Sequence, residues 1–150
     1  MVTYRSILAL VLAAIAAMIV SCGGQPQVSQ PPTYTDAQLE RIQTYKSDLL
    51  AMRDRMARIP DLVDRRQWSD IQSLIHGPLG ALRMKMFTLA HNLNPSEEKP
   101  AMSIAKDLFD YLVEIDDAAA AGNANKILSN YAAALKDFDA FLEQIPPEAA

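Results

Sequence analysis

The chain has 150 residues, of which 50% are hydrophobic and 21% charged, and its formal net charge is −4. This length suits one domain whose core is large enough to fold without disulfides, and the single cysteine excludes a bridge within the chain. The acidic balance argues against a nucleic-acid-binding protein, for which a basic surface is expected.

The N-terminal stretch has the layout of a secretory signal peptide. Arg5 supplies the positive charge, residues 7–20 are apolar, and the small residue Ser21 stands before Cys22. The order Ile-Val-Ser-Cys resembles the lipobox of bacterial lipoproteins, which implies a signal peptide over residues 1–21 and lipid attachment to Cys22. A one-pass transmembrane anchor is the alternative, because the apolar run is nearly long enough to span a bilayer.

Residues 22–34 predict a flexible linker between the lipidated Cys22 and the folded part. Pro26, Pro31 and Pro32 stand among Gln and Ser residues, which favours extended chain over a packed element. Twelve such residues reach roughly 35–40 Å at about 3.1 Å each, so the folded domain can stand away from the membrane.

From residue 35 onward the sequence predicts helices. The first has Thr35 or Asp36 as its N-cap and ends at Pro60. Its apolar residues recur at steps of three and four along about six turns, as expected for one buried stripe. They are Leu39, Ile42, Tyr45, Leu49, Met52, Met56 and Ile59.

The second helical region begins near Asp61 or Asp64 and ends around residues 92–95. Its stripe comprises Trp68, Ile71, Ile75, Leu79, Leu82, Met86, Leu89 and Leu93. Gly77, Pro78 and Gly80 interrupt this pattern. An interior proline costs a helix about 3 kcal/mol and each glycine about 1 kcal/mol. The sequence therefore predicts a kink or a broken turn here, with the stripe resuming on the same side.

The third helix begins near Ser96 or Lys99, with Pro100 in its first turn, and Gly122 is a suitable end. Its stripe comprises Ile104, Leu108, Tyr111 or Leu112, and Ile115.

The fourth helix follows a cap at Asn123 and ends at Pro146. Its stripe comprises Ile127 or Leu128, Tyr131, Leu135, Phe138, Phe141 or Leu142, and Ile145. No run alternates with period two, so we expect no sheet. Four amphipathic helices joined by short links predict an all-α fold over residues 35–150, an up-down-up-down four-helix bundle with a kinked second helix.

Charge is distributed unevenly along the predicted helices. Residues 35–93 carry nine basic and seven acidic side chains, whereas residues 94–150 carry four and eleven. The basic side chains at the first inter-helix link are candidate docking residues for an acidic partner surface: Arg55, Arg58, Arg65 and Arg66. The alternative is that they pair with Asp54, Asp61 and Asp64 within the bundle.

Patterns for catalysis and metal binding are missing from the sequence. His76 and His91 are 15 residues apart on one helical region, about 22 Å, which is too far to share a metal ion. Neither has the preceding Glu of di-iron bundles, and no C-x-x-C-H motif for covalent haem exists. We expect no catalytic residue, no metal site and no cofactor.

Two weaker ligand hypotheses stay open. The seven methionines could include a ligand to non-covalent haem, although methionine is far more often a core filler. Glu114, Asp116 and Asp117 could bind a hard cation loosely, but a solvated helix face explains them better.

Residues 68–83, which read WSDIQSLIHGPLGALR, resemble the second-helix signature of the PsbQ proteins. The specific part is Ile75, His76, Gly77, Pro78, Leu79 and Gly80, because few helices keep glycine and proline there. Tyr131, Phe138 and the total length are also similar, and the resemblance covers about residues 35–145. The lipobox indicates the cyanobacterial, lipid-bearing branch.

This resemblance implies an extrinsic lumenal subunit of photosystem II, lipid-anchored at the thylakoid membrane beside other extrinsic proteins. Such subunits are non-catalytic four-helix bundles that stabilise the oxygen-evolving side and its retention of calcium and chloride. Zinc is associated with some family members, but the two distant histidines give no site to carry over. The alternative is an unrelated exported lipoprotein whose helical bundle binds a ligand or assists assembly.

Overall fold

The computed structural model describes residues 33–147, and all its regular structure there is helical. The helices are α2 (Asp36–Met56), α3 (Ile59–Asp64), α4 (Trp68–His76), α5 (Leu82–Ala90), α6 (Pro95–Ala120) and α7 (Ala124–Glu143). The prediction of an all-helical fold without strands is thereby confirmed for this part of the chain. None of its helices is long and apolar enough to cross a membrane. The predicted signal peptide, Cys22 and nearly all of the linker lie outside the described residues.

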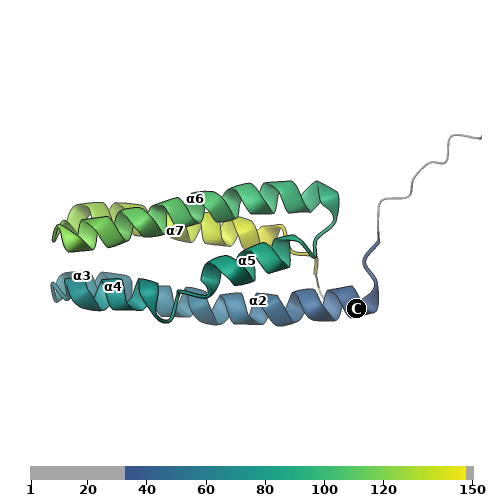
Figure 1. Cartoon of the computed structure of the whole chain (residues 1–150), viewed down its shortest axis with the longest axis horizontal. Coiled ribbons are helices and arrows are strands. Elements are labelled where there is room, and N and C mark those ends of the chain that lie inside the picture. Colours follow the sequence, from purple (N-terminus) through teal and green to yellow (C-terminus); the bar gives the residue numbers. More distant parts are fainter. Residues whose placement is uncertain (1–32, 148–150) are drawn as a thin grey trace, which may run out of the picture. The chain divides into compact units, whose positions relative to one another are not determined.

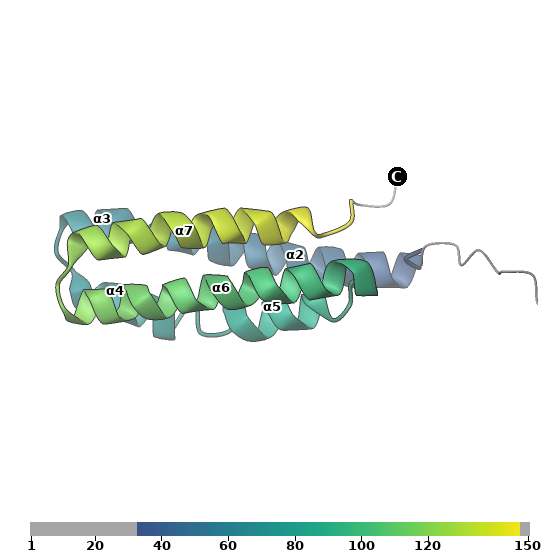
Figure 2. The same ribbon diagram turned by 90° about the horizontal axis from the view of Figure 1, so that it is seen from above.

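Helices α6 and α7 form an antiparallel hairpin and lie side by side along their lengths (Figures 1 and 2). Helices α4 and α5 both pack against α6, while α3 packs against α4 and α7. Helix α2 packs against α5 and α7. The contacts therefore form a closed circuit of α2–α3, α4–α5, α6 and α7.

The centre of this circuit is an apolar core. No polar or charged residue of the described part is buried. The largest fully buried side chains are Phe138, Phe141, Ile42, Leu49, Met56, Ile59, Ile71, Leu82, Met86, Leu89, Leu108 and Ile115. All twelve belong to the stripes that the sequence predicts, and Met56 and Met86 serve as core fillers, in keeping with the flexible shape of methionine.

The predicted caps explain where several helices start and stop. Thr35 forms a capping box with Gln38, each accepting a hydrogen bond from the other's backbone N–H. Asn123 accepts from the N–H of Lys126 at 3.1 Å and caps α7. Gly122 ends the α6–α7 turn with a φ of 66°, which glycine adopts without the penalty of a Cβ. These three predictions are confirmed.

Two details of the helices differ from the prediction. Helix α2 ends at Met56, so Pro60 does not end it but lies at the start of α3, where the amide needs no helical acceptor. Pro100 lies in the second turn of α6, not in its first, and so removes one helical hydrogen bond. The prediction of a kink or a broken turn in the second helical region is confirmed as a broken turn, because the helix is interrupted between His76 and Leu82.

Candidate functional site

The interruption between α4 and α5 is closed by its own backbone hydrogen bonds. The N–H of Gly77 donates to Ser73 O at 2.9 Å, and that of Leu79 donates to Leu74 O at 3.0 Å. Gly80 then donates to Gly77 O at 3.0 Å, and Leu82 to Leu79 O at 2.9 Å. Pro78 has no N–H to donate and stands at the exposed tip. The break is thus an ordered turn. In it, hydrogen bonds that span three or five residues replace some of the helical bonds that span four.

The two glycines of this turn are required by close backbone approach. A Cβ on Gly77 would lie 2.8 Å from Ser73 O, and one on Gly80 would lie 2.6 Å from His76 O. Real Cβ atoms essentially never approach a carbonyl oxygen so closely, and a carbonyl of the backbone has little freedom to retreat. Gly77 and Gly80 are therefore explained by the local geometry of the break.

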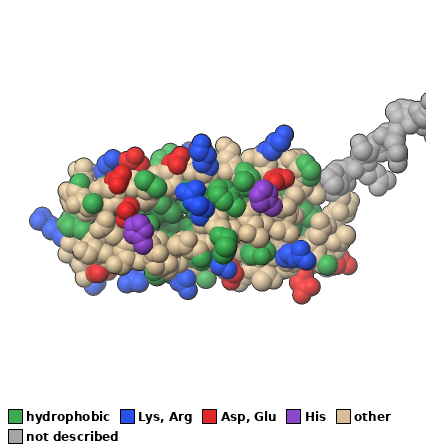
Figure 3. Space-filling view, in the orientation of Figure 1, with side chains coloured by type: hydrophobic (Ala, Val, Ile, Leu, Met, Phe, Trp, Pro, Cys, Tyr) green, Lys and Arg blue, Asp and Glu red, His purple; other side chains and the backbone are tan. Residues whose placement is uncertain are grey.

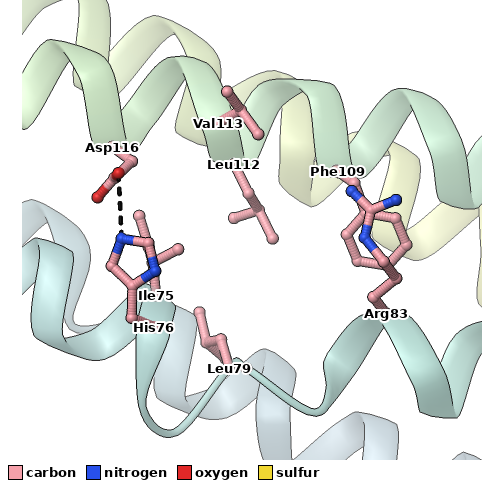
Figure 4. A pocket seen from close by; sticks show the side chains of 9 residues that line it. Ile75, His76, Leu79, Arg83, Phe109, Leu112, Val113 and Asp116 are labelled. Carbon is pink, nitrogen blue, oxygen red and sulfur yellow. Dashed lines mark hydrogen bonds and ion pairs between the residues drawn. The ribbon is translucent and has the colours of Figure 1, made fainter.

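The same break leaves a pocket of about 250 Å³ against α6, the helix-break pocket (Figure 4). It is lined by Ile75, His76, Leu79, Gly80, Arg83, Phe109, Leu112, Val113 and Asp116. Leu79 reaches it from the turn, whereas Leu112 reaches it from α6 (Figure 4). The turn carries the backbone away from α6, so side chains that a straight helix would press together stay apart.

A histidine–carboxylate pair bounds one end of the helix-break pocket. His76 Nε2 lies 3.1 Å from Asp116 Oδ2, which joins the end of α4 to α6 (Figure 4). The other carboxylate oxygen, Asp116 Oδ1, is buried and has no hydrogen-bond partner among the described residues. An unsatisfied buried acceptor is unfavourable by about 1–3 kcal/mol, so Asp116 Oδ1 is a locally costly feature of α6.

An arginine on an aromatic pair bounds the other end. The guanidinium carbon of Arg83 lies 4.4 Å from the ring centroid of Phe109 and 6.0 Å from that of Phe87. The two rings meet edge to face, with centroids 5.6 Å apart at an interplanar angle of 70°. Cation–π attraction holds the Arg83 head group over Phe109, as Figure 4 shows.

Sequence reasoning located this site only in part. The motif residues Ile75, His76, Leu79 and Gly80 all line the helix-break pocket. Arg83 and Phe109 were not predicted as parts of a site, and Asp116 was considered only as a ligand of a loose cation site, not as the partner of His76. A usable signal existed for Phe109, because Ala105, Phe109 and Leu112 recur at helical spacing on α6. No signal in the sequence indicated that Asp116 would meet His76.

The predicted docking arginines, here called the arginine end, surround the short helix α3. Arg55 lies in the last turn of α2, and Arg58 is the N-cap residue of α3. Arg65 and Arg66 follow the last residue of α3. Arg65 pairs with Asp61 at 3.0 Å, but both side chains are more than half exposed. Arg55, Arg58 and Arg66 form no salt bridge with another residue of the described chain.

Arg66 has a left-handed backbone with a φ of 55°. Its N–H donates to Val63 O and that of Gln67 donates to Leu62 O, both at 2.9 Å, which is the Schellman arrangement that ends α3. Gly122 holds the same place in the turn after α6, where the N–H of Asn123 donates to Ala118 O at 2.8 Å. A left-handed residue with a Cβ costs roughly 1–2 kcal/mol, so Arg66 is a locally unfavourable choice.

Most of the remaining candidate ligands form ion pairs with different residues and do not meet at one site. His91 Nδ1 lies 2.7 Å from Glu98 Oε1. His91 and His76 lie on one face of the molecule, and apolar side chains lie between them (Figure 3). Glu114 pairs with Lys126, whereas Asp116 faces His76. Residues 33–147 hold no group of three or more metal-ligating side chains. The loose cation site considered for Glu114, Asp116 and Asp117 therefore lacks a shared centre.

Tyr34 fixes the entry of the chain to the start of α6. Its hydroxyl donates to Glu97 and accepts from the N–H of Asn94 at 2.8 Å. Burial, and then the bond to Glu97, raise the pKa of Tyr34 to about 12. The hydroxyl accordingly keeps its proton across the neutral range and continues to donate.

The part of the chain that the structure describes is therefore all-helical, has a pocket at the break between α4 and α5, and holds no cluster of metal ligands. The family model for oxygen evolving enhancer protein 3, PsbQ, matches residues 2–146. CyanoQ of Synechocystis sp. is 38% identical over 143 residues, which cover 95% of this chain and 95% of that protein. The chain belongs to the PsbQ family of extrinsic photosystem II subunits, on its cyanobacterial branch.

Proposed function

We propose that this protein is a lipid-anchored lumenal subunit that stabilises the oxygen-evolving side of photosystem II and its retention of calcium and chloride. The family match over residues 2–146 carries this proposal, because it spans the N-terminal segment as well as the helices. The subunit has a non-catalytic role and works beside the other extrinsic proteins on the thylakoid membrane.

In this proposal the helical unit is an up-down-up-down four-helix bundle that acts as a rigid cover. The closed circuit of helix contacts and the fully apolar core support that arrangement. A rigid body loses little conformational freedom on binding, so most of its contact energy is available for holding the complex. Bound over the lumenal surface, it slows the exchange of ions between the oxygen-evolving centre and the solvent.

The N-terminal anchor is the second part of the proposal. Diacylglycerol on Cys22 supplies two acyl chains, which together suffice for stable membrane attachment, whereas one chain is marginal. Cys22→Ala should block lipidation and release the protein from washed membranes. Equal mass and equal membrane retention of the variant and the wild type would contradict the anchor.

The arginine end supplies orientation in this proposal. An exposed pair such as Arg65–Asp61 contributes at most about 1 kcal/mol, so Arg65 can exchange Asp61 for a partner's carboxylate at little cost. Arg55, Arg58 and Arg66 form no salt bridge within residues 33–147 that docking would have to break. The strained backbone of Arg66 also suits a contact residue, since such strain persists at positions retained for binding.

The test reconstitutes photosystem II complexes isolated without this subunit. Wild-type protein should bind and raise oxygen evolution in buffers poor in calcium and chloride. The Arg65→Glu/Arg66→Glu variant should bind at least tenfold more weakly, because desolvated charge pairs at an interface become repulsive when one sign is reversed. Arg41→Glu, a reversal near the start of α2, serves as the matched control.

Two results would contradict these proposals separately. Absence of wild-type binding would overturn the assignment to photosystem II. Unchanged binding by a well-folded Arg65→Glu/Arg66→Glu variant would remove the docking role of the arginine end and leave the assignment standing. Wild-type binding through the arginine end should also weaken as salt rises, because exposed charges are screened over about 10 Å at 0.1 M.

A further inference from the structure

The helix-break pocket has the size and the walls of a receptor for one large side chain. Ile75, Leu79, Leu112 and Val113 supply apolar surface, and its volume is about 250 Å³. An apolar cavity of about 150 Å³ is enough to bind benzene. A leucine or an aromatic side chain from outside therefore fits, and the space extends beyond it to both polar ends.

Arg83 places a positively charged group at the edge of this pocket, and contacts within the protein already restrain that group before any partner binds. The stack on Phe109, with a guanidinium-to-centroid distance of 4.4 Å, restrains its position. No carboxylate of residues 33–147 forms a salt bridge with Arg83, whereas Arg53 donates from Nε and Nη2 to the two carboxylate oxygens of Asp139. A stacked guanidinium keeps its planar fork of N–H groups available for two parallel bonds to a carboxylate.

We propose that the helix-break pocket receives one large apolar side chain from an acidic loop of a partner protein, and that Arg83 pairs with a carboxylate beside that side chain. Charge complementarity at the Arg83 end selects this occupant, since a preformed cation stands there at the rim of the apolar recess, whereas the carboxylate of Asp116 lies at the opposite end beside His76. The inference rests on the proposed function, which makes the partner a lumenal protein of photosystem II.

This role also accounts for the turn that interrupts the second helical region. Residues 77–81 move the backbone away from α6, and Gly80 keeps that turn tight. A continuous helix would close the recess. Binding energy at protein interfaces concentrates in such pockets, where an anchor side chain is surrounded by polar groups that exclude water.

The experiment fills the pocket from its rim. Val113 is 54% exposed, so Val113→Trp places an indole over the recess without entering the core. Leu50→Trp, at a position 41% exposed on α2 and outside the pocket lining, is the matched control. Arg83→Glu reverses the charge, and Arg83→Lys keeps the charge but loses the planar fork. Binding of each full-length variant to photosystem II complexes lacking this subunit is then titrated.

Val113→Trp and Arg83→Glu should each weaken binding about thirtyfold, the loss expected of an interface hot spot. Arg83→Lys should lose less than Arg83→Glu, and Leu50→Trp should bind like the wild type. Equal melting temperatures would show that the variants are folded.

Three outcomes would overturn the inference. If the wild type binds and Val113→Trp binds equally well, the pocket is not used and the assignment to photosystem II survives. If the wild type does not bind, the proposed function and the partner fail together. If sedimentation shows that the wild type forms dimers which Val113→Trp abolishes, the occupant is a second copy of this chain.

Discussion

The α6–α7 hairpin and the α3–α5 region of this protein both bury apolar side chains in the same core, but they differ in the length of their helices and in the residue at their turns. Helices α6 and α7 run for 26 and 20 residues, and their turn uses a glycine in the left-handed conformation. Residues 59–90 are divided into helices of six, nine and nine residues, with an arginine in the equivalent left-handed position. The comparison separates a region of long helices joined by a glycine turn from a region of short helices whose turn carries a strained arginine.

Both regions nevertheless bury apolar stripes in one core. Phe138 and Phe141 of α7 are completely buried, as are Ile71 of α4 and Leu82 of α5. The stripe therefore survives the break, because the turn of residues 77–81 returns the chain to the same side. What the break changes is the outer surface, where the helix-break pocket and the arginine end lie. We infer that the irregular region and the facing side of α6 carry the contacts, and that α7 supports them from the core.

The largest expected effect is on the hairpin. Phe138→Ala should lower the free energy of unfolding by about 3–5 kcal/mol, since it removes a fully buried aromatic side chain and leaves a cavity. Chemical denaturation measures this change. Leu128→Ala, at a position 37% exposed on the same helix, should cost far less. Equal losses at the two positions would show that α7 does not pack as described.

An intermediate effect is expected at the break. Gly80→Ala should destabilise the protein by roughly 1–3 kcal/mol, because its Cβ would meet His76 O at 2.6 Å and the turn would have to move. The same variant should weaken binding to photosystem II, since the turn forms one wall of the helix-break pocket. Thermal melting and the binding titration test both parts. Unchanged stability would mean that the turn is loose and the pocket poorly defined.

The smallest effect has the opposite sign. Arg66→Gly should stabilise the protein by about 1 kcal/mol, because glycine adopts a φ of 55° without the cost of a Cβ. Weaker binding by this more stable variant would indicate that Arg66 is kept for contact. The reverse substitution in the hairpin, Gly122→Arg, should destabilise by a similar amount. Loss of stability in Arg66→Gly would contradict the local strain.

The sequence predicted the parts of the fold that depend on local chemistry. Thr35, Gly122 and Asn123 were identified as helix ends because their side chains, or the lack of one, act on neighbouring amides. The apolar stripes predicted the core because burial follows helical periodicity. Pro60 was misplaced because the same residue suits the beginning of a helix as well as the region after its end.

The candidate site was less predictable because it depends on distant parts of the chain. The motif of residues 75–80 predicted a break in the helix, but the pocket is also lined by Phe109 and Leu112 of α6, which lie far away in the sequence. The pairing of His76 with Asp116 spans 40 positions, and no local rule connects them. The strain at Arg66 had no signal either, since glycine or asparagine is the usual residue in that position.

The hydrogen bonds of the Tyr34 hydroxyl also affect how a force applied at the N-terminal side of the helical unit is distributed among its helices. A pull that reaches residue 33 from the N-terminal side acts first on the Tyr34 hydroxyl, which is bonded to Asn94 and Glu97. The load is therefore shared between α2 and the start of α6 instead of unwinding α2 alone. The arginine end lies beyond the far end of α2, about 30 Å away along its 21 residues (Figure 1).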